Sequence, residues 1–377
     1  MINQAATKTS STADALRAYL VTRDLTPGDR LPSISELEAR FAAGRTVVQQ
    51  AIGILRDEGF LETVDRRGVF VTQRPPHLTR LAIAFGSDPK VPDANRFVQT
   101  MYQTATAGAR PAQGYDLVVY GGVGDPAQPP FQRLRADAVA HRLAGILFLG
   151  CPHDVTCAPS LAALALPRVQ ICPIAEDQAL PAVRTHGHAF WHMAYDHLRA
   201  RGCRHIAVIA TANRLRDAMG QIRDEALAIA PDWVQGATKG LAVANEQLVH
   251  LLFRTPANER PDGLIIADDN LEPDILRALL RLGLEIDRDV TVVAHCNWPA
   301  GQLSPLPIAH LGYGVPELLN QAIAMVTRLL ADPRTACPDV LVDPSFQPEP
   351  SSHFSELYAS PVTTSHVGAN VIHEGTW

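Results

Sequence analysis

The chain has 377 residues, of which 46% are hydrophobic and 19% charged, a balance typical of a soluble globular protein with two or three domains. No apolar run reaches the roughly 20 residues needed to span a bilayer, and the N-terminus lacks the pattern of a secretion signal, so a cytoplasmic protein without membrane contact is expected. The spacing of the six cysteines fits neither a zinc ribbon nor a disulfide scaffold.

The net charge of −6 excludes a uniformly basic nucleic-acid binder, but the charge is unevenly distributed. Residues 1–76 hold ten Lys/Arg and nine Asp/Glu, a net charge of +1, whereas the remainder holds 23 basic and 30 acidic residues, a net charge of −7. Because DNA binding requires local phosphate contacts rather than a basic whole, this division permits a DNA-binding head on an acidic body.

The head begins with two predicted helices. Apolar spacing over 12–24 predicts an amphipathic helix, which "TPGDR" at 26–30 ends. A second helix is expected to start at Ser33. Glu36 lies three residues further on, so the two side chains form the sequence pattern of a capping box.

A third helix and a hairpin follow. The helix is predicted from about Arg45 to Glu58, with an apolar stripe and Gly59 at its end. Two short β-prone runs then flank a turn at 65–68. The order helix, helix, helix, hairpin predicts a winged helix-turn-helix over residues 8–72.

Residues 73–79, with two prolines, are interpreted as a linker to an α/β body. Short apolar runs then alternate with helix-length segments, which predicts parallel sheets covered by helices. Residues 80–350 suffice for two such sheets, with a ligand between them at the C-terminal ends of the strands. The tail over 351–377, rich in Ser, Thr and His, is expected to be poorly ordered. The expected strands are 80–86, 116–122, 145–150, 168–173, 205–210, 263–268 and 290–296, and the expected helices include 95–108, 131–142, 191–202 and 272–283.

The head resembles the GntR family of bacterial transcription regulators. The segments that carry this resemblance are "PGDRLPSISELEARF", "RTVVQQAIGILRDEGFL" and "RRGVFV", in that order. The resemblance implies a homodimer that reads an inverted repeat in double-stranded DNA. It also implies that the third helix enters the major groove and that the hairpin, the wing, lies along or in the minor groove.

Several head residues are candidates for DNA contact. Arg45 and Thr46 stand at a helix start, which favours a phosphate, and Gln49, one turn on, can pair with adenine. Ser35 and Gln49 occupy positions where the family often has arginine, and Gly44 and Arg66 also depart from it, which predicts an operator unlike the family consensus. The remaining candidates are Ser33, Ser35, Arg66, Arg67 and Gly68.

The body resembles the LacI/GalR-type sensor domain, which is similar to periplasmic sugar-binding proteins. The segments "AYDHLRARGCRHIAVIA", "DGLIIADDNLEPDILRALLRLGLEIDRDVTVVAHCN" and "LPIAHLGYGVPELLNQAIAMVTRLLADP" carry this resemblance. A GntR head on such a body is the combination found in arabinose-responsive repressors. The resemblance implies a two-lobed domain with a small-molecule effector between the lobes.

The expected effector positions depart from the family pattern. The family's Asp-Asn pair before the helix at 190–201 is replaced by "RTHGHAF", which brings His186 near the site, while Asp269 is retained. Arg214 or Arg216 is the candidate for the family's arginine. The family's carboxylate falls at Cys296, with Asn297 next. Because sugars need several paired polar groups, these losses argue against an ordinary hexose or pentose, and a different ligand, or none, becomes plausible. The resemblance still implies a small-molecule effector such as a sugar or a sugar derivative.

The sequence shows no clear metal site and no catalytic motif. His188 and His192 are spaced to share a helix face, but no further ligand is evident, so neither a metal nor a cofactor is expected. A GntR-headed pyridoxal phosphate protein would need a suitable lysine, and the chain has only Lys8, Lys90 and Lys239. The sequence therefore predicts a DNA-binding regulator rather than an enzyme, a repressor in preference to an activator. The alternative is a body that serves only as a dimerisation scaffold.

Overall fold

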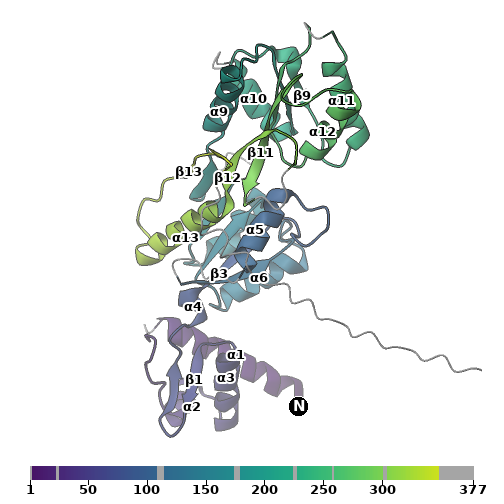
Figure 1. The fold of residues 1–377 in the computed structure, drawn as a ribbon. Helices are drawn as coiled ribbons and strands as arrows, with labels where there is room; N and C mark the ends of the chain where they lie inside the picture. The colour runs from purple at the N-terminus through teal and green to yellow at the C-terminus, as the bar shows by residue number, and fades with distance from the viewer. Residues whose placement is uncertain are drawn as a thin grey trace, which may run out of the picture.

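A computed structural model describes residues 2–22, 25–107, 114–173, 179–223, 227–256, 259–299 and 304–347. The predicted tail over 351–377 lies outside these residues. Figure 1 shows a small head at one end and a body of two α/β lobes, with the first lobe next to the head. Among the described residues, no helix combines the length and apolar character that a membrane span requires.

The head is a winged helix-turn-helix, as predicted. It consists of α1 (Ile2–Thr22), α2 (Ile34–Phe41), α3 (Arg45–Asp57), β1 (Leu61–Val64) and β2 (Gly68–Val71). The capping box at the start of α2 is present, because Ser33 Oγ accepts from the Glu36 N–H and the Glu36 carboxylate accepts from the Ser33 N–H. The predicted start of the first helix near residue 12 is wrong, since α1 begins at Ile2. The apolar stripe of α3 is buried against α1.

The segment interpreted as a linker packs against the head. It contains the short helix α4 (Pro76–Thr79), and His77 stacks on Phe60 with ring centroids 5.7 Å apart. Burial, assisted by the charge of His141, lowers the pKa of His77 to about 4. The connection between head and body is therefore a packed segment and not a free tether.

The first lobe is built on a parallel sheet of strand order β13-β7-β6-β5-β3-β4. The predicted strands are present, whereas β7 and β13 were not anticipated. Helix α13 lies on β5, β6 and β7, and α5 and α6 pack on β4. The elements are β3 (Arg80–Phe85), β4 (Asp116–Tyr120), β5 (Gly145–Leu149), β6 (Arg168–Ile171), β7 (Ala182–Thr185), β13 (Val340–Val342), α5 (Arg96–Thr106), α6 (Pro129–Val139), α7 (His153–Thr156), α8 (Pro159–Ala162) and α13 (Val315–Ala331).

The second lobe has a sheet of order β14-β12-β11-β10-β8-β9, in which only the β12–β14 pair is antiparallel. Its strands β8 and β10 are unbroken apolar runs, as expected where helices cover both faces, whereas β11 carries polar residues in its C-terminal half. The elements are β8 (Ile206–Ala210), β9 (Val234–Gly236), β10 (Gly263–Ile266), β11 (Thr291–Trp298), β12 (Ala309–Gly314), β14 (Ser345–Phe346), α9 (Gly187–Ala200), α10 (Ala212–Arg223), the 3-10 helix η1 (Pro231–Trp233), α11 (Ala242–Phe253) and α12 (Glu272–Arg281).

Three connections, from β7 to α9, from β12 to α13 and from β13 to β14, carry the chain between the lobes. Hydrogen bonds join all three. The His186 N–H donates to Val342 O at 2.9 Å, and the Tyr313 hydroxyl donates to His186 O at 3.2 Å. Because each bond links two different connections, the lobes meet at one common hinge.

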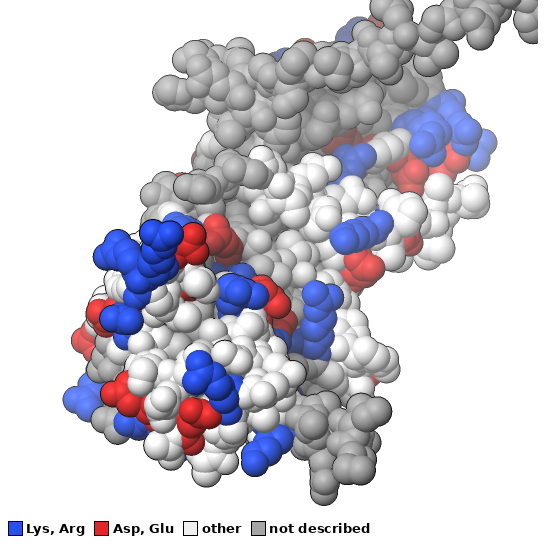
Figure 2. All heavy atoms as spheres, turned by 90° about the horizontal axis from the view of Figure 1, so that it is seen from below, with Lys and Arg blue, Asp and Glu red and all other residues white. Residues whose placement is uncertain are grey.

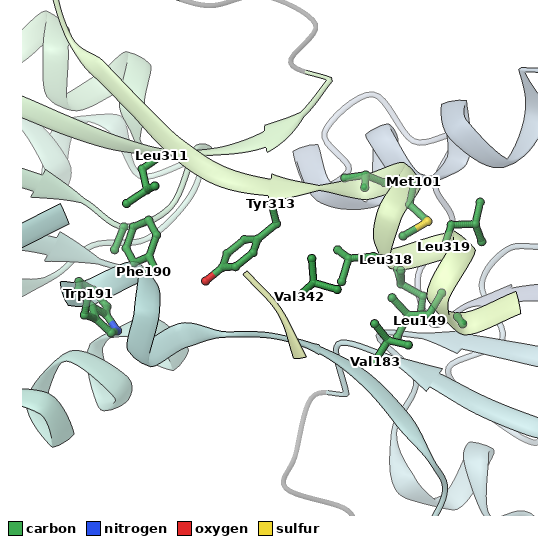
Figure 3. Close-up of a cluster of buried hydrophobic side chains, with 14 of the residues drawn as sticks. Met101, Leu149, Val183, Phe190, Trp191, Leu311, Tyr313, Leu318, Leu319 and Val342 are labelled. Carbon is green, nitrogen blue, oxygen red and sulfur yellow. The ribbon is translucent and has the colours of Figure 1, made fainter. Parts of the chain in front are cut away.

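Apolar side chains continue the core through this hinge. Figure 3 shows Tyr313 of β12 between Phe190 and Trp191 of α9 on one side and Leu318 and Val342 on the other. Tyr313, Phe190 and Trp191 have no exposed surface. The buried cluster is thus continuous from one lobe into the other, and a change in lobe angle must repack it.

A chain of charges joins the head to the first lobe. Glu58, just after α3, accepts from Arg17 of α1 at 2.8 and 3.0 Å and from Arg142 of the first lobe at 2.6 Å. Arg142 also donates to Asp137 at 2.8 Å, and Asp137 accepts from the Tyr120 hydroxyl at 2.6 Å. The Arg17 side chain is only 3% exposed and that of Glu58 15% exposed. Glu58 therefore bridges two cations from different domains, each of which also pairs with a second carboxylate, Arg17 with Asp14 and Arg142 with Asp137.

We predict that Glu58→Ala destabilises the protein by about 2 to 3 kcal/mol, because it leaves two partly desolvated guanidinium groups without their shared acceptor. Urea unfolding monitored by circular dichroism measures this loss. Since the charges join two domains, the head and the body should also unfold in more separate steps than in the parent protein.

The matched control is Glu62→Ala on β1, whose side chain is exposed. It should change the free energy of unfolding by less than about 0.5 kcal/mol. A Glu58→Ala protein that unfolds like the Glu62→Ala protein would contradict the proposed coupling of head and body.

Candidate nucleic-acid interface and effector site

The start of α3 presents the predicted DNA-binding residues to solvent. Arg45, Thr46 and Gln49 are all exposed, while Val48 between them is buried in the head. Gly44 is the N-cap and offers no capping side chain, so the first N–H groups of α3 remain available to an anion. The structure brings these three candidates together on one exposed surface.

The wing has the tight turn that the sequence predicts. Arg66 adopts a φ of 60° and Gly68 a φ of 116°. A Cβ atom on Gly68 would lie 3.1 Å from Arg30 Nε, so glycine allows the Arg30 side chain to lie against the wing. Arg67 is exposed and lies over the Phe70 ring, with Cζ 5.8 Å from the centroid.

Arg30 was missed in the sequence analysis. Arg30 lies four residues before α2. Its backbone forms an isolated antiparallel β-bridge with Phe70 of β2, so this segment runs beside the two-stranded wing. The placement of Arg30 beside the wing follows only from this pairing between segments that are distant in the sequence. Seen from below, the head carries separate groups of basic side chains with acidic ones between them (Figure 2), which agrees with its small net charge.

The two serines differ in availability. The Ser33 hydroxyl is engaged in the capping box, donating to Glu36 at 2.8 Å. Ser35 is exposed in the first turn of α2. A similar contrast holds on α3, where Gln50 accepts from Thr9 of α1 at 2.9 Å whereas Gln49 faces solvent. The geometry therefore favours Ser35 and Gln49 as the freer groups for DNA.

At the other end of the molecule, two predicted effector residues meet at the ends of β10 and β11. Asn297 Nδ2 donates to Asp269 Oδ2 at 2.8 Å, and Asn270 donates to the other Asp269 oxygen at 3.1 Å. Asp269 is 5% exposed. Burial, followed by repulsion from Asp268, raises its pKa to about 6 from the ordinary 3.8.

Arg214, near the start of α10, reaches the same end of the sheet. It lies 3.3 Å from His295 Nε2 of β11, with Cζ about 6 Å from the ring centroids of Phe190 and Tyr313. Burial, and then the charge of Arg214, lowers the pKa of His295 well below its usual value. Arg216, the other predicted arginine, is exposed. We call Arg214, Asp269, His295 and Asn297 the interlobe site.

Two further predicted residues take other positions. Cys296 lies between His295 and Asn297 on β11, so its side chain points to the opposite face of the sheet; burial raises the pKa of its thiol to about 12. His186 sits at the hinge, where Nδ1 lies 2.6 Å from Asp343 Oδ1. Its ring is directed to that carboxylate and not to the interlobe site.

The first lobe also reaches the interlobe site. The Arg96 N–H, at the start of α5, donates to Asn270 Oδ1 at 3.0 Å, and Lys239 of the second lobe donates to the Asp93 carbonyl. Cys172, after β6, is close enough to Arg214 for the arginine's charge to affect its pKa, which burial raises to about 11. Arg96, His295 and Tyr313 were not expected at this site, because none of them stands in a recognisable sequence motif.

His188 and His192, considered as metal ligands, have ring centroids 4.2 Å apart on α9. Within the described ranges, no group of three His, Cys, Asp or Glu side chains is placed to hold a metal ion.

Comparison with known protein families agrees with the two-part architecture. Residues 8–71 match the model of the bacterial regulatory proteins of the gntR family, and residues 195–351 match the periplasmic binding protein-like domain. These matches cover the head and most of the second lobe together with α13.

Individual relatives point the same way. The chain is 21% identical over 337 residues to the arabinose metabolism transcriptional repressor of Geobacillus stearothermophilus, covering 83% of this chain and 88% of the relative. A LacI-family regulatory protein from Chloroflexus aggregans has the same body fold, with a TM-score of 0.58, 15% identity and coverage of 71% of this chain and 96% of that one. A LacI-family regulator from Lactobacillus casei, solved with bound sucrose, gives a TM-score of 0.53 at 16% identity, covering 72% of this chain and 98% of that one.

These three relatives are transcription regulators and not enzymes, as the sequence predicted for this chain. The exposed start of α3 and the Arg-rich wing agree with that function. The protein is a DNA-binding transcription regulator that joins a winged helix-turn-helix head, matching the gntR family of bacterial regulatory proteins, to a periplasmic-binding-protein-like domain with the fold of LacI-family regulators.

Proposed function

We propose that the protein is a cytoplasmic, homodimeric repressor whose affinity for an inverted-repeat operator changes when a small molecule binds at the interlobe site. In this proposal residues 8–72 bind DNA, 73–79 connect the head to the body, and 80–350 form the sensor. Gln49 reads a base in the major groove, Arg45, Thr46, Ser33 and Ser35 contact phosphates, and Arg66, Arg67 and Gly68 form the DNA contact of the wing.

The observation that supports this proposal most directly is that the interlobe site and the head are attached to different lobes. The polar groups of the interlobe site belong mainly to the second lobe, whereas the charge chain through Glu58 fixes the head to the first. A molecule that draws the lobes together therefore changes the orientation of the head relative to the second lobe. In a dimer that change alters the spacing of the two α3 helices.

The effector must discriminate between the two lobe arrangements. A differential affinity of roughly 1–3 kcal/mol is enough to change operator affinity about 5- to 150-fold. In this proposal, repacking of Tyr313, Phe190 and their neighbours at the hinge would separate the two lobe arrangements.

The proposal is tested by selecting operators from random DNA with the purified full chain and then screening small molecules by thermal shift. The panel comprises sugars, sugar acids, nucleosides and purines. A compound that raises the melting temperature and also changes operator affinity supports the sensor. Operator binding with no responding compound would instead favour a body that serves only as a dimerisation scaffold.

We predict that Arg45→Ala weakens binding to all DNA sequences about tenfold and lowers the salt slope of binding by about one for each protomer, because one phosphate contact is lost. Gel-shift titrations at several KCl concentrations measure both quantities. The control is Arg56→Ala in the last turn of the same helix, whose side chain is 55% exposed. Equal salt slopes for the two variants would rule out the phosphate contact.

We predict that Gln49→Ala relaxes the preference at one base pair of each half-site, at a cost of roughly 1–3 kcal/mol, because a bidentate contact to adenine is lost. Sequencing of operators selected by parent and variant measures the preference. Gln50→Ala is the control, since the Gln50 side chain bonds to α1. If parent and Gln49→Ala select the same sequences, the residue does not read a base.

We predict that Asp269→Asn abolishes the effector response yet stabilises the unliganded protein by roughly 1–3 kcal/mol at pH 7. The pKa of Asp269 is about 6 when folded and 3.8 ordinarily, so the folded state resists ionisation. The parent therefore loses stability as the pH rises from 4 to 7, and the asparagine does not.

Urea unfolding at pH 4 and pH 7 checks this prediction, and the advantage of the variant should disappear at pH 4. Asp232→Asn, an exposed carboxylate of the same lobe, serves as the control. A variant that still responds to the effector would place the ligand elsewhere, and an advantage independent of pH would contradict the ionisation argument.

A further inference from the structure

We propose that the effector is an anion that also carries hydroxyl groups, such as a sugar acid or a sugar phosphate. Its negative group would bind Arg214, and a hydroxyl would donate to Asp269. This inference rests on the proposed function of the interlobe site and specifies the chemical class of its ligand.

Arg214 is a partly buried cation whose contacts do not neutralise it. Among the described residues it contacts His295 and the rings of Phe190 and Tyr313. Burial raises the pKa of Tyr313 to about 12, so its hydroxyl carries no charge at neutral pH. A guanidinium removed from water is costly without an anionic partner, and its fork of N–H groups fits a carboxylate or a phosphate.

His295 extends the same argument. A guanidinium can only donate, so His295 Nε2 accepts from Arg214 and the ring proton lies on Nδ1. Nδ1 is buried and has no partner among the described residues, and the whole residue is 4% exposed. His295 thus brings no negative charge to Arg214, and the positive charge at this end of the site favours an electron-rich ligand group.

The opposite end of the site has the reverse character. Asp269 is buried, accepts from Asn297 and Asn270, and can accept a further hydrogen bond when ionised. His295 and Asn297 are two residues apart on one face of β11, about 7 Å along the strand. One molecule of the size of a single sugar spans this distance, with its anionic group at Arg214 and a hydroxyl at Asp269.

A neutral sugar would offer Arg214 hydroxyl acceptors but no opposite charge, whereas an anion without hydroxyls would leave the remaining acceptor capacity of Asp269 unused. The two ends of the site thus specify different groups of one ligand. The chain also lacks the Asp-Asn pair that the family places before α9 to bind sugar hydroxyls. His186 stands in that region, but its ring faces Asp343 at the hinge.

The experiment uses the full chain and four matched probes: glucose, gluconate, glucuronate and glucose 6-phosphate. Isothermal titration calorimetry at pH 7.5 measures binding, and a gel shift measures the effect on the operator. We expect at least one anion to bind 10-fold or more tightly than glucose. Gluconate or glucuronate as the better ligand would identify a carboxylate, and glucose 6-phosphate a phosphate.

The variants test the residue directly. Arg214→Gln should weaken binding of the preferred anion about 10- to 100-fold, because a charge-assisted contact is removed. Arg214→Lys keeps the charge and should lose less. Arg216→Gln, two residues on and exposed, should bind like the parent. Unchanged melting temperatures without ligand show that each variant is folded.

The inference and the proposed function fail in different ways. Glucose binding as tightly as the anions, or Arg214→Gln retaining the anion preference, would overturn the inference and leave effector control intact. If none of the four probes binds, the inference that the effector is a hydroxylated anion is also overturned. In that case a response to another compound of the wider screen would still support the proposed effector control. If no compound gives a response, both the inference and the proposed effector control are rejected.

Discussion

The structure depends on one shared carboxylate. Glu58 directly follows α3 and receives hydrogen bonds from Arg17 within the head and from Arg142 in the first lobe. A poorly exposed carboxylate of this kind is costly to leave unpaired, and separating the domains would break its contact with Arg142. The head is thereby held to one lobe in a defined orientation, supported by the stacking of His77 on Phe60.

The second constraint is the hinge. Three connections run between the lobes, and the bonds from His186 to Val342 and from Tyr313 to His186 keep them together. Because a continuous buried cluster fills this region, the lobes can rearrange only by repacking it. The head is fixed to one lobe and the polar site lies mainly on the other. Lobe movement at this hinge is therefore the physical event that would connect ligand and DNA.

Local patterns were sufficient for most of the apolar strands and for α3, but they did not predict β12 or the first turns of α1. The strands with unbroken apolar runs and the amphipathic stripe of α3 appear where the sequence placed them, because burial on both faces or on one face leaves a clear periodicity. The strands β7, β9, β13 and β14 have two to four residues each. They are stabilised by pairing with distant strands, a feature that no local window contains. The packing of the presumed linker against Phe60 was missed for the same reason.

By itself, the sequence determined the winged helix-turn-helix, its capping box and the α/β class of the body, since propensity, capping and periodicity are local properties. Only the tertiary structure decided which neighbouring residues belong to the site. Arg214 faces the interlobe site whereas Arg216 faces solvent, and Asn297 meets Asp269 whereas Cys296 points to the other side of β11. Which residue of each pair faces the site depends on how its helix or strand packs against elements that are distant in the sequence.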